Sequence, residues 1–234
     1  MPGQLIRSFQ EPRPLNARCA DAAVILERAH ESAAALLAAR HLSRAERGRP
    51  RGISTDDEQD LLRAMLVMAA AGLDAMMKQL VRDTIPVLLP SEANVQDGLE
   101  KFVTRRLGTR ADTDDQRGRT GNVLLARALI SISPQQTFLA EYLDELSGGS
   151  LQSPDELTRV AKALGLDPKI VDKNVLTPIF RTRNKILHEL DISLERDRRR
   201  RNHRGLQDMV KSANTLLGLA EAILGQVNTK LSAE

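Results

Sequence analysis

The sequence contains no tryptophan, one tyrosine and one cysteine in 234 residues, and aromatic side chains make up only 2% of it. A core with so few aromatic rings must be packed from Leu, Ala, Ile, Val and Met, which favours helix-on-helix packing over a sheet. The lone Cys19 excludes an internal disulfide, and four histidines with this one cysteine provide no plausible structural zinc set. We therefore expect neither a metal ion nor another cofactor.

The sequence also shows no segment typical of export or of a membrane anchor. The N-terminal residues lack an apolar signal core. The one long apolar run, residues 61–77, is interrupted by Arg63 and Asp74 and is shorter than a bilayer span requires. Because 41% of the residues are apolar, the chain can bury a core. We expect a globular cytoplasmic protein with no membrane partner.

Apolar residues recur with helical spacing along the whole chain, and no alternation typical of a strand persists for more than a few residues. Ser54 or Thr55, followed by acidic residues, is expected to cap the most apolar helix, which Pro86 and Pro90 should end. Residues 108–121, rich in Gly, Arg and Asp, are expected to form an exposed loop. The other helices are expected over residues 17–47, 91–107, 122–132, 134–146, 154–164, 177–190 and 205–228.

These patterns predict an all-α fold built around a helical bundle. Residues 1–52 are expected to provide an N-terminal helix and a linker that pack on the bundle. Residues 53–230 are expected to form the helical domain itself, with inserted short helices.

The segment RTRNKILHEL, residues 181–190, carries an unusual set of polar side chains for an amphipathic helix. At about 100° per residue, Arg181, Asn184 and His188 fall on one face. Asn184 could hold the imidazole in one tautomer, and Arg181 could bind an anion beside it. An apolar arc occupies the opposite face, formed by Leu176, Ile179, Phe180, Ile186, Leu187 and Leu190.

Arg183 falls in the middle of this apolar arc. A guanidinium on an apolar face needs a partner, because an unpaired buried charge is very costly. Asp74, an acid within the apolar run 61–77, is one candidate partner. Alternatively, the arc faces a second subunit across a partly wet cleft.

The motif R-N-x-x-x-H at residues 183–188 resembles the signature of the HEPN superfamily, an arginine and a histidine with four to six residues between them. Arg181 with His188 also satisfies this spacing, so the motif leaves open which arginine leads. An apolar helix with an acid upstream, the turn KALGL at 162–166 and a long last helix are similar in order to the RiboL-PSP branch. The resemblance extends over about residues 55–228.

The resemblance implies a HEPN-like helical bundle that dimerises and acts as a metal-independent endoribonuclease, often a toxin or an anti-phage defence effector. A 2′-hydroxyl of RNA would attack the adjacent phosphorus, His188 would transfer protons near neutral pH, and arginine would stabilise the charged phosphoryl oxygens. A two-fold axis would join two half-sites into one composite site. An antitoxin or defence protein is a further expected partner.

A basic run lies between this motif and the last helix. Residues 195–205 contain seven Arg or His side chains, and clustered guanidinium groups suit phosphate because each can donate two hydrogen bonds at once. The run could instead be a solvated loop. The candidate RNA-binding residues are Arg198, Arg199, Arg200, Arg201 and His203.

Two other functions remain open. Several HEPN proteins keep the fold only to bind or assemble, so a catalytically silent RNA-binding module is one alternative. A DNA-binding regulator is the other, because Ala161, Gly165 and Val171 are spaced as in helix-turn-helix proteins. Leu190 stands where related toxins carry a tyrosine that is modified to silence them, so that control is not expected here.

Overall fold

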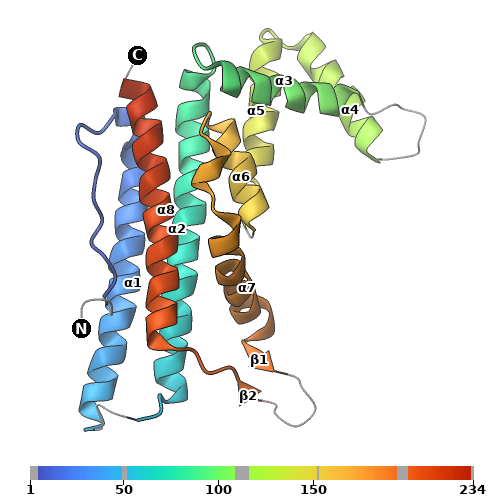
Figure 1. Cartoon of the computed structure of the whole chain (residues 1–234). Coiled ribbons are helices and arrows are strands. Elements are labelled where there is room, and N and C mark those ends of the chain that lie inside the picture. Colours follow the sequence, from blue (N-terminus) through green and yellow to red (C-terminus); the bar gives the residue numbers. More distant parts are fainter. Residues whose placement is uncertain (1–4, 49–51, 109–115, 152, 194–199, 233–234) are drawn as a thin grey trace.

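The structure is a computed structural model that describes residues 5–48, 52–108, 116–151, 153–193 and 200–232. Within these ranges the chain forms eight α-helices, two short 3-10 helices and one pair of two-residue strands (Figure 1). The expected all-α fold class is therefore confirmed.

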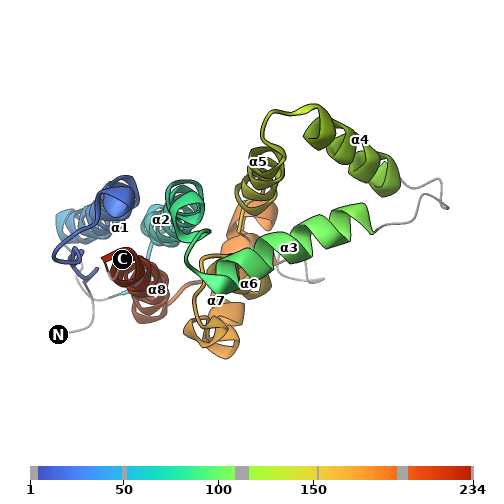
Figure 2. The same ribbon diagram turned by 90° about the horizontal axis from the view of Figure 1, so that it is seen from above.

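Three long helices form the bundle and run side by side over most of its length (Figures 1 and 2). They are α1 (Ala20–Glu46), α2 (Asp56–Leu88) and α8 (Leu206–Ser232). The short 3-10 helix η1 (Ala17–Cys19) leads into α1. Their facing side chains are mainly Leu, Ala and Met and are buried, as the scarcity of aromatic residues predicts.

Helix α2 is the central member of the bundle. Thr55 caps its N-terminus by accepting a hydrogen bond from the backbone N–H of Glu58. By length and composition α2 could cross a membrane, contrary to the expectation from residues 61–77 alone, but core helices of soluble proteins pass the same test. Of its most apolar 18-residue window, 56% is buried within the molecule.

The expectation that Pro86 ends this helix is wrong. Helix α2 continues through Pro86 to Leu88. The proline lies on the exposed side of the last turn, whereas Ile85 and Leu88 beside it are fully buried. Packing of these neighbours offsets the backbone hydrogen bond that proline cannot make.

Helices α3 (Ala93–Leu107), α4 (Gln116–Ile130) and α5 (Pro134–Ser147) form an arm that extends away from the bundle (Figures 1 and 2). Residues 109–115 lie outside the described ranges, but α4 begins at Gln116, so the end of the expected loop 108–121 is helical. Gly121 lets α4 approach α3 closely, because a Cβ there would lie 2.2 Å from the carbonyl oxygen of Arg106.

The chain returns to the bundle through α6 (Pro154–Ala163), η2 (Pro168–Ile170) and α7 (Lys173–Glu189). Helix α7 begins four residues before the expected start at residue 177, because the Asp172 side chain caps it through the backbone N–H groups of Asn174 and Val175. Pro178 therefore lies inside the helix. The strands β1 (Ile192–Ser193) and β2 (Arg200–Arg201) pair antiparallel between α7 and α8.

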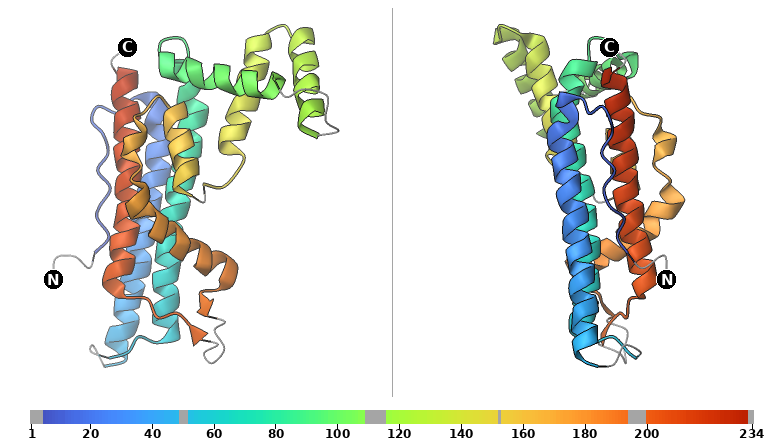
Figure 3. Two further views of the ribbon diagram at one scale, coloured as in Figure 1. Left: turned by 45° about the vertical axis from the view of Figure 1, so that its right-hand side comes forward. Right: turned by 90° about the vertical axis from the view of Figure 1, so that its left-hand side faces the viewer.

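An N-terminal strap, residues 5–16, runs in extended form along α8 (Figure 3). Side chains spaced seven residues apart on α8 accept hydrogen bonds from strap backbone N–H groups. Asn214 accepts from Arg7 at 3.0 Å, Glu221 from Gln10 at 3.2 Å and Asn228 from Asn16 at 2.7 Å. The strap thus covers the groove between α1 and α8.

Candidate functional site on α7

Helix α7 carries the motif and packs on the bundle through one side only. Leu176, Ile179, Phe180 and Ile186 are buried, as the apolar arc predicts. Leu187 and Leu190 belong to the same predicted arc, yet they are 42% and 60% exposed. The C-terminal part of the apolar face is therefore open to solvent next to His188.

Arg181 and His188 are both exposed, and two helical turns separate them on one face of α7. Neither side chain forms a hydrogen bond or an ion pair with another residue in the described ranges. Asn184 lies between them and is partly buried. These three side chains form a short polar face that is open to a ligand or to another molecule.

Arg183 points the other way. It is only 9% exposed, and its Nη1 donates a hydrogen bond of 3.0 Å to Oδ1 of Asn184. Its buried Nε has no hydrogen bond partner among the described residues. Asn184 thus contacts the buried arginine while it borders the exposed polar face.

Asp74 is not the partner of Arg183. Its carboxylate accepts a hydrogen bond of 2.8 Å from Lys78, one turn along α2, and another of 2.9 Å from the backbone N–H of Leu151. This acid therefore anchors the segment between α5 and α6 to the bundle. The helical pattern placed Arg183 on the buried face of α7, but it did not identify the residues that this face contacts.

The end of α7 is fixed by Asp191, a residue that sequence reasoning missed. Leu190 and Asp191 both adopt left-handed backbone conformations, with φ of 50° and 56°. Such conformations are costly for residues other than glycine. They turn the Asp191 side chain into the protein, where it is fully buried.

Three side chains hold the Asp191 carboxylate. Arg63 donates to it at 3.1 Å, Asn202 at 3.0 Å and Arg204 through both Nε and Nη2, the former at 2.9 Å. Burial alone would raise the pKa of Asp191, but the hydrogen bonds from Arg204, Asn202 and Arg63 outweigh it and lower that pKa. Asp191 follows the last turn of α7 and lies three residues after His188. The cluster therefore holds this end of α7 against the first turns of α2.

Part of the predicted RNA-binding run forms ion pairs at the surface of this molecule. Arg201 donates to both carboxylate oxygens of Asp60 at 2.5 and 2.6 Å, and Arg63 donates to the same carboxylate at 3.0 Å. His203 is exposed. Arg200 lies in β2, opposite Ser193. Arg198 and Arg199 lie outside the described residues.

One signal in the sequence could have led to the Asp191 cluster. Arg63 interrupts the apolar run of α2 and is 5% exposed, so it requires an acid by the same argument as Arg183. Asp191 immediately follows the motif. Pairing these two residues requires knowing that the end of α7 lies beside the start of α2, and spacing in the sequence does not give that.

The helix-turn-helix alternative lacks the helix it requires. After α6 the chain turns at Gly165, with φ of 72°, and residues 168–170 form only one 3-10 turn. A 3-10 turn thus stands where a recognition helix would have to begin, and the next α-helix, α7, begins only at Lys173. In the same described ranges, no three His, Cys, Asp or Glu side chains are grouped so that they could hold a metal ion.

Comparison of the chain with protein-family models, with curated proteins and with solved structures finds no match.

Proposed function

We propose that this protein is a metal-independent endoribonuclease whose active site is completed when the α7 helices of two copies meet. The observation that supports this proposal is the open polar face of α7, where Arg181 and His188 lie exposed and unengaged. An imidazole and a guanidinium on one open face are groups suited to RNA cleavage.

In the proposed reaction His188 takes the proton from a ribose 2′-hydroxyl or gives one to the leaving 5′-oxygen. Arg181 binds the non-bridging oxygens, where negative charge accumulates as the 2′-oxygen attacks the phosphorus. The products are a 2′,3′-cyclic phosphate and a 5′-hydroxyl end. A second copy brings a second His188, so that one histidine can act as base and the other as acid.

The exposed leucines of α7 support a contact between two copies. Leu187 and Leu190 flank His188 and leave an apolar surface beside the polar face. A two-fold contact along α7 would bury these side chains and would bring the two polar faces together. We accordingly propose a cytoplasmic homodimer that acts as a toxin or defence effector on RNA and is controlled by a separate partner protein.

The decisive experiment incubates the purified protein with total RNA in EDTA. The variants are His188→Ala and Arg181→Ala, and His41→Ala on α1 is the matched control, because His41 lies on a different helix. We expect wild type and His41→Ala to leave 2′,3′-cyclic phosphate ends and the other two to be inactive. Cleavage that survives His188→Ala would refute the proposed site.

A catalytically silent RNA-binding module is the second candidate. It is favoured by the burial of Arg183, the arginine of the R-N-x-x-x-H spacing, away from the face of His188. On this hypothesis the protein binds RNA and releases it on addition of salt, without cleavage. Sedimentation in the same experiment separates the two, because the nuclease requires a dimer whereas a binding module can act as a monomer.

A further inference from the structure

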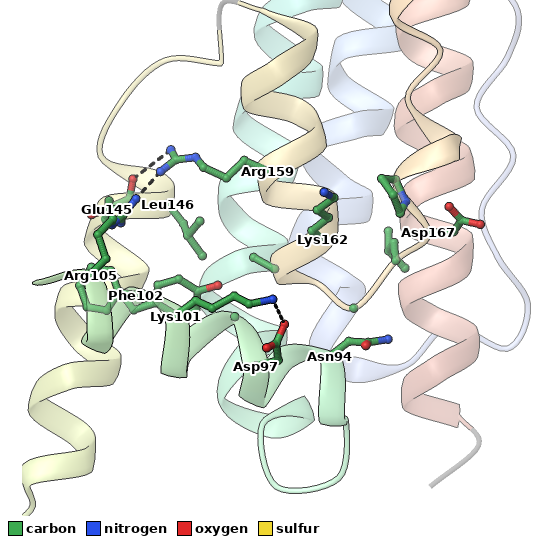
Figure 4. Close-up of a pocket in the computed structure, with 16 residues that line it drawn as sticks. Asn94, Asp97, Lys101, Phe102, Arg105, Glu145, Leu146, Arg159, Lys162 and Asp167 are labelled. Atoms are coloured by element: carbon green, nitrogen blue, oxygen red, sulfur yellow. Dashed lines mark hydrogen bonds and ion pairs between the residues drawn. The ribbon is translucent and has the colours of Figure 1, made fainter. Parts of the chain in front are cut away.

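A second candidate site lies in the arm, away from the motif. A cleft of about 770 Å³ opens between α3, α5, α6 and the loop that follows α6 (Figure 4). Helix α3 provides one wall through residues three or four positions apart, from Asn94 to Arg105. Neither Arg181 nor His188 lines this cleft, so it is separate from the polar face of α7.

The floor of the cleft is apolar and contains an aromatic pair. The rings of Phe102 and Tyr142 are tilted at 43° with centroids 5.2 Å apart, and both residues are at most 5% exposed. Leu146 and Leu166 extend the floor on either side. Such a floor suits a flat apolar group, which would add its own ring contacts to the pair.

The hydroxyl of Tyr142 forms no hydrogen bond with another residue in the described ranges. Gly98 keeps space beside it, because a Cβ at that position would lie 2.7 Å from the Tyr142 oxygen. Burial raises the pKa of Tyr142 to about 12, so the hydroxyl remains a proton donor at neutral pH. The floor thus offers one unused donor to a ligand.

The rim of the cleft has an excess of positive charge. Arg105, Arg106 and Arg159 all pair with the single carboxylate of Glu145, the last two at 3.1 and 3.2 Å. Over all the side chains that line the cleft, four cations stand against three carboxylates: Lys101, Arg105, Arg159 and Lys162 against Asp97, Glu145 and Asp167. Of these cations, Lys162 has no acidic partner in the described ranges. An anionic group at this rim would therefore be stabilised.

We propose that this cleft binds a small organic anion with a flat, mainly apolar body, a carboxylate or a phosphate. Its body lies on Phe102 and Tyr142, its charged group lies between Lys162 and Arg159, and an oxygen of the ligand accepts a hydrogen bond from the Tyr142 hydroxyl. The size agrees, because small-molecule sites are commonly about 300–1,000 Å³. The proposal is independent of nuclease activity.

Tyr142 is the only tyrosine, which makes the test specific. Protein produced with 3-fluorotyrosine carries fluorine on Tyr142 alone, so its fluorine resonance reports on this cleft. The probes are 1-naphthoate and phenyl phosphate as the two anion arms, with neutral 1-naphthamide as the matched control. We expect a saturable shift of the fluorine resonance with at least one anion, and none with the amide at the same concentration.

Calorimetry with the better anion then assigns the residues. Lys162→Ala should weaken binding roughly tenfold, as expected for one charge-assisted hydrogen bond. Lys211→Ala on α8, an exposed lysine outside the cleft, should leave it unchanged. Tyr142→Phe keeps the ring and should also weaken binding, and melting curves show that each variant is folded. No shift at millimolar concentration of either anion, equal binding of the amide, or no effect of Lys162→Ala would overturn the proposal.

Discussion

Arg63 and Asp191 form a buried ion pair of 3.1 Å between residues 128 positions apart in the sequence. The arginine comes from the first turns of α2, and the aspartate is the residue that follows segment 181–190. Arg204, just before α8, binds the same carboxylate. Three separate parts of the chain are thus joined at one point, and the position of His188 depends on it.

Replacing Asp191 by asparagine should destabilise the protein strongly. The isosteric amide leaves Arg63 and Arg204 without their counter-charge, and breaking a buried pair in this way costs about 3–5 kcal/mol. The melting temperature should fall on the order of 10 °C for a chain of this length. Asp144→Asn, at an exposed position on α5, is the control and should melt like the wild type.

The same variant gives a pH dependence with a definite sign. Because the folded-state pKa of Asp191 is lowered, its contribution to stability is complete above the ordinary carboxyl pKa of about 4 and is lost as the pH falls below that value. The difference in unfolding free energy between wild type and Asp191→Asn should therefore be large at pH 7 and shrink below about pH 4. A difference that does not change with pH would contradict this account.

Replacing Gly72 by alanine should lower the stability of the protein, whereas replacing Gly218 by alanine should raise it. A Cβ at Gly72 of α2 would lie 2.1 Å from the Cβ of Ala29 on α1, so the two helices would have to separate. We expect a loss of about 1–3 kcal/mol. Gly218 on α8 has no atom within 4 Å of the added Cβ, and alanine there should stabilise by about 0.5–1 kcal/mol. Urea denaturation of both variants measures the change in the free energy of unfolding and thus tests both predictions.

If the nuclease proposal is correct, replacing Arg181 and replacing Arg183 should have different effects on the rate of RNA cleavage. Arg181 shares the exposed face of His188, so Arg181→Met should lower the cleavage rate about 100-fold or more without changing the melting temperature. Arg183 is buried, and Arg183→Met keeps its apolar contacts, so cleavage should largely persist. The reverse order of effects would assign the reaction to Arg183.

Asp60 should restrain RNA binding because it holds Arg201. The hydrogen bond from Arg201 is the main cause that lowers the pKa of Asp60. Asp60→Asn should release the arginine, tighten RNA binding and make its salt dependence steeper, by about 0.7–0.9 in the logarithmic slope. Arg201→Ala should do the opposite. Asp57→Asn removes the same charge from an exposed position nearby, and an equal effect there would exclude a specific role of Asp60.

The helices were predictable from the sequence where their pattern is long and one-sided. Helices α1, α2 and α8 lie where the apolar stripes predict them, because burial of a stripe is a property of each helix alone. The first residues of α4 were taken for a loop, since Gly118 and Gly121 interrupt the pattern. Gly121 instead serves the close approach to α3, which only the tertiary structure reveals.

The candidate site was predictable only as far as single faces of α7. The pattern places Arg181 and His188 on one face and Arg183 on the opposite, apolar face; in the structure the first two are exposed and Arg183 is buried. It could not say that Asp74 binds Lys78 and Leu151, because an acid in a helix can turn to any neighbour within reach. Pairings between distant segments follow from how the helices are arranged, and helical periodicity contains no such information.

The strap along α8 determines the order in which the molecule can assemble. Its hydrogen bonds to Asn214, Glu221 and Asn228 join positions at least 207 residues apart, whereas α1 and α2 are neighbours in the chain. Closing so long a loop costs entropy before any contact repays it, so such contacts form late in folding. Interactions absent from the transition state govern the unfolding rate. The hydrogen bonds of the strap should therefore slow the unfolding of the bundle more than they change its folding rate.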